Sequence, residues 1–112
     1  MKYDVRLTDE AKQNVRDAFA WYAERSQAAA DQWYAGFLKL LESLAIEPHR
    51  HPIAMENSRF PIELRRANYG SGRRLTHRII FAIREKAVVV YSVRHVSQDE
   101  WRPDEPQRGD GQ

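Results

Sequence analysis

Residues 75–95 read LTHRIIFAIREKAVVVYSVRH. In an extended chain every second side chain lies on the same face. From Leu75 to Ile83 one such face would carry Leu75, His77, Ile79, Phe81 and Ile83. A polar step at residues 84–86 then leads into a second run, residues 87–95, which is rich in β-branched valine. Such residues favour strands, and so short a polar step favours a tight turn. The stretch therefore predicts a hairpin of two central strands.

The start of the chain predicts one strand followed by two helices. Residues 3–7 alternate in polarity, as a half-buried strand does. Thr8 can cap a helix that runs to about Arg25. Ser26 can cap a second helix directly afterwards, and Pro48 forces an end to it. Because the connection is so short, we expect an antiparallel helical hairpin.

Apolar side chains recur along both predicted helices with the spacing of one buried face. These positions are Ala11, Val15, Ala18, Phe19 and Tyr22 in the first helix, and Ala30, Trp33, Phe37, Leu40, Leu41 and Leu44 in the second. We also expect Trp21 to pack in the core with Trp33 and Phe37, rather than to bind a ligand.

The remaining segments complete a single-domain α+β fold. Residues 49–60 have the composition of a loop, and residues 62–66 alternate like a short strand. The expected order is β-α-α-β-β-β, with an antiparallel-type sheet packed against the N-terminal helical hairpin. We expect the first strand to return and pair within this sheet. The domain should span residues 1–101, and residues 102–112, which lack apolar side chains, should form a disordered tail.

Composition excludes several classes of protein. The chain has no cysteine, so disulfides and thiolate metal sites are excluded. No apolar run approaches the roughly 20 residues that span a bilayer, and the polar alternation at the start is unlike a signal peptide. We therefore expect a cytoplasmic protein without membrane contact.

Positive charge is concentrated in the second half of the chain. Residues 48–102 carry 11 basic and 5 acidic side chains, a balance of +6, whereas residues 1–47 carry 6 basic and 8 acidic ones. Almost all of the basic residues in the second half are arginines, whose planar guanidinium suits contact with carboxylates and phosphates. This asymmetry favours an anionic partner, either a nucleic acid or an acidic protein segment. Arginine stems that cover a solvated sheet face are the alternative.

Short motifs in a fixed order carry a family resemblance from about Tyr3 to Asp99. They are Leu7-Thr8, Ala11, Tyr22, Ala29, Trp33, Leu40-Leu41-Glu42-Ser43-Leu44, Pro48-His49-Arg50-His51-Pro52, Glu63-Leu64-Arg65, Tyr69-Gly70, His77-Arg78-Ile79-Ile80-Phe81-Ala82-Ile83 and Val93-Arg94-His95. Together they resemble the RelE/ParE superfamily of toxins from type II toxin–antitoxin systems. The resemblance implies growth arrest, and a cognate antitoxin, encoded beside the toxin, that neutralises it.

Two activities occur within that superfamily. ParE-like members poison DNA gyrase and are not known as enzymes, whereas RelE-like members cut messenger RNA on the ribosome. The ending Arg94-His95 with Gln98-Asp99 is more similar to ParE-like proteins. The lysines on which RelE partly relies have no matching cluster here. We therefore expect a ParE-like toxin, with a ribosome-dependent mRNA endoribonuclease as the alternative.

The alternative needs a proton acceptor, a proton donor and positive charge at the phosphate. His95 is the candidate acid or base, with Arg94 beside it and Glu63 as a possible base. The simpler interpretation is that His95 only caps the last strand. For contact with the target or another anion, the candidates are Arg65, Arg73, Arg74 and Arg78.

Two further motifs give no site. His49 and His51 lack a third ligand of sensible spacing, so we expect no metal. Residues 70–74 lack the residues of a phosphate-binding P-loop, so we expect no cofactor, although Arg73 and Arg74 could form an exposed tip. His77 alternates in phase with Ile79 and should point into the core.

Overall fold

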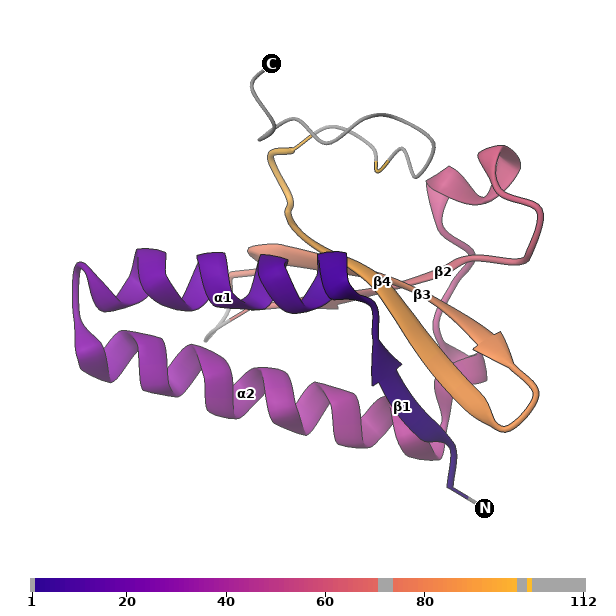
Figure 1. The fold of residues 1–112 in the computed structure, drawn as a ribbon, viewed down its shortest axis with the longest axis horizontal. Helices are drawn as coiled ribbons and strands as arrows, with labels where there is room; N and C mark the ends of the chain where they lie inside the picture. Colours follow the sequence, from indigo (N-terminus) through magenta and orange to yellow (C-terminus); the bar gives the residue numbers. More distant parts are fainter. Residues whose placement is uncertain (1, 71–73, 99–100, 102–112) are drawn as a thin grey trace.

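The computed structural model describes residues 2–70, 74–98 and 101 (Figure 1). Along the chain lie β1 (Asp4–Leu7), α1 (Asp9–Ala23), α2 (Gln27–Ile46), the 3₁₀ helices η1 (Pro48–Arg50) and η2 (Met55–Arg59), β2 (Arg65–Tyr69), β3 (His77–Arg84) and β4 (Ala87–His95). The predicted α+β class and the order β-α-α-β-β-β are confirmed. Arg73 and the predicted tail, residues 102–112, lie outside the described residues. No helix in the described ranges is long and apolar enough to cross a membrane.

Both helices begin where the sequence predicts. The hydroxyl of Thr8 accepts a hydrogen bond from the backbone N–H of Ala11 at 3.1 Å, and Ser26 does the same for Ala29 at 3.2 Å. Each cap satisfies one of the N–H groups that the first helical turn leaves without a partner. The two helices lie antiparallel, as Figure 1 shows. Helix α1 ends at Ala23, two residues before its predicted end.

The sheet is mixed, with strand order β1-β4-β3-β2. Strands β2, β3 and β4 pair antiparallel, as predicted, but β1 pairs in parallel with β4. The helical hairpin explains this direction, because its two opposed helices return the chain to the end of the sheet where β1 starts. Strand β2 therefore runs with β1, and two reversals give β4 the same direction. The tight turn between β3 and β4 consists of Glu85 and Lys86, with Glu85 at a φ of 57°.

Strand β2 lies further along the chain than predicted. It covers Arg65–Tyr69 instead of residues 62–66. Leu64 is fully buried just before the strand, and its N–H donates to Oδ1 of Asn57 at 2.7 Å instead of joining a ladder. The strand ends at Tyr69, whose side chain is buried and whose hydroxyl donates to the carbonyl of Trp33.

The main core lies between the helices and one face of the sheet. Trp33 and Phe37 of α2 are fully buried and stack with ring centroids 5.5 Å apart, so their predicted core positions are confirmed. The core prediction for Trp21 is wrong, because this side chain is 52% exposed. Its neighbour Tyr22 is the residue of this turn that packs against the core. Trp21 instead lies edge-on to Tyr22 and under the guanidinium of Arg25.

A second, smaller core covers the opposite face of the sheet. Its buried members are Ala54, Leu64, Ile80, Ala82 and Trp101. The segment predicted as a plain loop thus contains η1 and η2 and shields this face. As a result β3 is buried on both faces from His77 to Ala82, which explains its nearly continuous apolar sequence.

Candidate functional site

His95, the candidate acid or base, ends β4 and lies opposite His77, the first residue of β3. The two imidazole rings meet edge to face with centroids 5.4 Å apart. Nδ1 of the exposed His95 accepts a hydrogen bond from the N–H of Ser97 at 3.1 Å. The backbone N–H of His95 donates to Oε1 of Gln98 at 2.8 Å. His95 thus stabilises the turn after β4, which is the capping role that the sequence left open.

A cavity of about 770 Å³ opens between α1 and this end of the hairpin. We call it the histidine cavity; one wall is formed by α1 residues between Asn14 and Tyr22, the other by residues 74–77 and by Val93 and residues 95–98. Trp21 lies on the first wall and Arg74 on the second. Both side chains are exposed, and within the described ranges Arg74 has no ion pair. The cavity therefore offers an aromatic ring, an imidazole and a cation to a partner.

His77 forms the buried end of this cavity. Its side chain is 6% exposed, and Nδ1 accepts a hydrogen bond from Nε1 of Trp33 at 3.4 Å. The hydroxyl of Thr76 lies 2.8 Å from the same nitrogen. Burial, and secondarily the charge of His95, lowers the pKa of His77 from 6.5 to about 4. His77 is therefore neutral near pH 7, and the prediction that it points into the core is confirmed.

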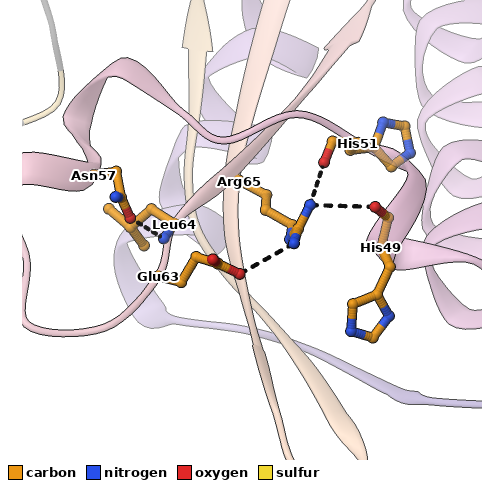
Figure 2. A network of polar contacts seen from close by, with 6 residues as sticks. All are labelled: His49, His51, Asn57, Glu63, Leu64 and Arg65. Carbon is orange, nitrogen blue, oxygen red and sulfur yellow. Dashed lines mark hydrogen bonds and ion pairs between the residues drawn. The ribbon is translucent and has the colours of Figure 1, made fainter.

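Glu63 and Arg65 belong to a different part of the molecule, shown in Figure 2. Nη1 of Arg65 donates to the carbonyl oxygens of His51 at 2.6 Å and His49 at 3.2 Å, while Nη2 lies 3.1 Å from Oε1 of Glu63. The Arg65 side chain is 17% exposed. These contacts attach the chain around η1 to the start of β2. Arg65 thus holds backbone in place and leaves little surface for an anionic partner.

The three candidate catalytic residues do not converge. Arg65 pairs with Phe81, whereas His95 pairs with His77, four residues away on β3. At about 3.3 Å per residue this separates the Glu63 region from His95 by roughly 13 Å along the strand. Arg94 lies opposite Arg78 in the β3–β4 register, on the face of the sheet away from His95. Neither Glu63 nor Arg94 therefore joins His95 in an acid–base set.

Arg78 is used inside the fold. Its side chain is 9% exposed, and Nη1 lies 3.0 Å from Oε2 of the fully buried Glu56. The same carboxylate oxygen accepts a hydrogen bond from the backbone N–H of Trp101 at 2.8 Å. Glu56 therefore joins three distant parts of the chain beneath the second face of the sheet. Of the candidate arginines in the described residues, Arg74 alone is exposed.

Some residues that shape these sites were not predicted from the sequence. Glu56 lay in a segment without periodicity, and Trp101 lay at the predicted end of the domain. Asn14 interrupts the apolar face of α1, which was the available signal; its Oδ1 accepts from the N–H of Val93 at 2.9 Å and ties α1 to β4. Among the described residues no three histidine, aspartate or glutamate side chains are grouped as metal ligands.

A second hollow, of about 1000 Å³, lies on the other flank of α1. We call it the β1 groove; it is lined by Val5, Arg6, Leu7, Lys12, Val15, Arg16, Phe19, Asp31, Tyr34, Phe37, Leu38 and Leu41. Tyr34 and Leu38 are 42% and 43% exposed although they are large and apolar. In α1 only Ala11 is fully buried. The helix therefore covers the core while a hollow remains open on each side of it.

Comparison with known proteins gives matches to a family model and to solved structures. A family model described as the ParE toxin of the type II toxin–antitoxin system, parDE, matches residues 5–100. Among solved structures, a chain of the chromosomal ParDE TA system from P. aeruginosa aligns with a TM-score of 0.65 and 12% sequence identity, covering 85% of this chain and 97% of that one. At this identity the structural match supports the fold alone. No curated protein matches the sequence.

Proposed function

The chain belongs to the family of ParE toxins of type II toxin–antitoxin systems, and we propose that it arrests growth by binding an essential protein such as DNA gyrase. In this proposal the protein acts in the cytoplasm, where gyrase works on DNA. A cognate antitoxin binds the toxin and neutralises it until the antitoxin is lost.

The observation that supports binding rather than catalysis is the surface around α1. The histidine cavity and the β1 groove lie on its two flanks, and both expose large aromatic or aliphatic side chains. Aromatic residues and arginines are the side chains most enriched at the centres of protein interfaces. The histidine cavity, with Trp21 and Arg74, is the surface we assign to the target.

The nuclease alternative lacks comparable support. Cleavage of RNA by its own 2′-hydroxyl needs an acid, a base and a cation around one phosphate. Glu63 and Arg94 lie away from His95, and Nδ1 of His95 already accepts a hydrogen bond from Ser97. The chain is therefore proposed to act as a binding protein.

One experiment in cells separates the two activities. The chain is expressed from a tightly controlled promoter, alone or together with the protein encoded by the adjacent gene. Plasmid supercoiling and chromosome breaks report on gyrase, and primer extension on abundant transcripts reports on mRNA cleavage. We expect growth arrest with altered supercoiling, uncut transcripts and rescue by the adjacent gene. Cut transcripts with normal supercoiling would favour the nuclease, and harmless expression at detectable protein levels would contradict any toxin.

A further inference from the structure

The ring of His77 is held in one tautomer. Its Nδ1 accepts a hydrogen bond from the indole N–H of Trp33 at 3.4 Å, and the hydroxyl of Thr76 lies 2.8 Å from the same nitrogen. An indole N–H can only donate, so Nδ1 carries no proton. The proton of the neutral ring is therefore on Nε2, on the other side of the imidazole.

His95 is held in the same way by its own turn. The backbone N–H of Ser97 donates to Nδ1 at 3.1 Å, and the Ser97 hydroxyl lies 2.8 Å from that nitrogen. Because a backbone N–H can only donate, Nδ1 is the acceptor, and the neutral ring again carries its proton on Nε2. The two histidines are paired across β3 and β4 with ring centroids 5.4 Å apart, and they thus share one tautomer.

This tautomer limits what the histidine pair can do. A general base or a metal ligand must offer a free lone pair, and a metal-bound histidine usually donates its other N–H. Here both Nδ1 lone pairs are engaged, so both Nε2 atoms are protonated in the neutral rings. The pair therefore presents two N–H donors, which are suited to a hydrogen-bond acceptor.

The other polar groups of the histidine cavity also favour an acceptor. Oδ1 of Asn14 already accepts from the N–H of Val93 at 2.9 Å, and Oδ1 of Asp17 accepts from Gln13 at 2.8 Å. Arg74 adds an exposed cation to the wall. Among the hydrogen bonds of the described residues, none engages Nε2 of either histidine. A carboxylate from outside would supply the missing acceptor and meet the charge of Arg74.

Large apolar side chains surround the cavity. Trp21, Leu75 and Val96 line it and are 52%, 55% and 46% exposed, and we call them the apolar rim. Apolar contacts around a polar one exclude water, and the polar contact is stronger in such surroundings. A protein partner can cover the rim with apolar surface of its own, whereas the sugar–phosphate backbone of a nucleic acid is polar. The rim therefore favours an acidic side chain of a protein over a phosphate.

We propose that His77 and His95 form a paired N–H donor site that binds a glutamate or aspartate side chain of the protein target, with Arg74 beside it and the apolar rim closing over the contact. This inference rests on the proposed function, because it assumes a protein target for the histidine cavity. It names the chemistry by which the cavity recognises that target, and it gives His77 a role in binding besides its place in the core.

The first test measures the tautomers and carboxylate binding in the full-length chain. NMR of isotope-labelled histidine distinguishes a protonated ring nitrogen from an unprotonated one. Near pH 7.5 we expect Nε2 protonated and Nδ1 unprotonated in both rings. Sodium acetate serves as the probe for the acidic side chain. It should shift the Nε2 signals of His77 and His95, whereas sodium chloride at the same ionic strength should not.

The second test measures binding to purified gyrase. His77→Met removes the donor and should raise the dissociation constant about 10-fold or more, as expected for one hydrogen bond to a charged group. His77→Gln retains an N–H donor and should recover most of this loss. His95→Ala should weaken binding only a few-fold, because water can replace an exposed donor. His49→Met is the matched control and should bind like the wild type, since His49 is exposed outside the cavity. Thermal denaturation shows whether each variant is folded at the assay temperature.

Other outcomes would overturn the inference. A proton on Nδ1 of either ring, no response to acetate, or wild-type affinity in folded His77→Met would show that the pair is not a carboxylate site. A His77→Gln variant as weak as His77→Met would mean that the imidazole shape, and not the donor, is required. Shifts of the same signals with a short DNA duplex, but not with acetate, would assign the cavity to a nucleic acid.

The inference stays testable in two further cases. If His77→Met does not fold, the tautomers and the acetate titration still decide. Failure of the proposed function would look different, with no growth arrest and no gyrase binding by the wild type, while the response of both histidines to acetate persists.

Discussion

His77 shows how a single buried side chain can make stability depend on pH. Its Nδ1 accepts from Trp33, and burial lowers its pKa to about 4. In the unfolded chain a histidine titrates near 6.5. Between about pH 4 and 6.5 the unfolded chain therefore binds a proton at this position, whereas the folded chain keeps His77 neutral. Acid therefore favours unfolding in this window, and the contribution of neutral His77 to stability is complete only above about pH 6.5.

This gives the first prediction. As the pH falls from 7 to 4.5, the free energy of unfolding should decrease by about 2 kcal/mol more in the wild type than in His77→Gln, because glutamine does not titrate. Chemical denaturation at the two pH values measures both proteins. The carboxylates titrate in both, so the difference between the two decreases isolates His77. Equal decreases would show that the imidazole is not held neutral by its surroundings.

The second prediction concerns His95 and Arg74, which lie on the same wall of the histidine cavity. His95 is exposed, so His95→Ala should change stability by about 0.5 kcal/mol or less and should weaken toxicity only mildly. Arg74→Ala removes an exposed cation and should weaken binding of purified gyrase, more at low salt than at high salt. Growth assays at graded induction and binding at two salt concentrations measure these effects. Complete loss of toxicity in His95→Ala, with the melting temperature and antitoxin binding unchanged, would favour the nuclease.

At the level of elements, the sequence predicts regular structure well where one local rule dominates. Thr8 and Ser26 cap the helices as expected, and the β3–β4 hairpin follows from its β-branched residues. The errors arise where tertiary contacts override local pattern. Trp21 is a large aromatic residue, as core residues often are, but it lies one position off the buried face of α1. Tyr69 belongs to β2, where its hydroxyl donates a hydrogen bond to the carbonyl of Trp33.

Some residues of the candidate site could be predicted from the sequence, but their contacts and positions in the fold could not. Sequence reasoning identified Arg74 and His95, which the structure places around one cavity. It could not foresee that Arg78 is neutralised by Glu56, because the two residues are 22 positions apart and no local pattern links them. Nor did the +6 balance of residues 48–102 indicate the β1 groove, which is formed by the N-terminal half. An excess of positive charge favours binding to anions, but it does not indicate which surface binds them.

The third prediction tests the contact between α2 and β2. A Cβ at Gly36 would lie 2.5 Å from the Tyr69 hydroxyl, whose hydrogen bond to Trp33 fixes the ring. Gly36→Ala should therefore destabilise the protein by about 1–3 kcal/mol, although alanine is the better helix former by about 1 kcal/mol. Thermal denaturation measures the change.

A double variant supplies the control for this contact. In the background of Tyr69→Phe the hydroxyl is absent, so Gly36→Ala should cost clearly less or even stabilise α2. If the cost is the same in both backgrounds, the overlap with the Tyr69 hydroxyl is not what keeps a glycine at this position.

On the scale of the whole molecule, the sheet is shielded on both faces by different means. The helices cover one face, and the segment around η2 together with Trp101 covers the other. Trp101 also donates from Nε1 to Oε2 of Glu10 at 2.8 Å, so the end of the described chain contacts the first turn of α1. Because both faces are closed, the surfaces left for partners lie along the flanks of α1 and the edge of β1.

The last prediction tests whether the smaller core, which covers the second face of the sheet, depends on the buried ion pair between Glu56 and Arg78. Glu56→Leu leaves Arg78 charged and buried without a partner and removes the acceptor of the Trp101 N–H. Removing one member of a buried pair typically costs about 3–5 kcal/mol, whereas replacing both with apolar residues of similar size is often nearly neutral. The double variant Glu56→Leu/Arg78→Met should therefore recover most of the stability lost in Glu56→Leu. The part not recovered should be about 1–3 kcal/mol, the cost of leaving the Trp101 N–H without an acceptor. Urea denaturation of the wild type, the single and the double variants measures each step. A double variant no more stable than Glu56→Leu would mean that the pair's geometry, rather than the burial of an unpaired charge, holds the cover in place.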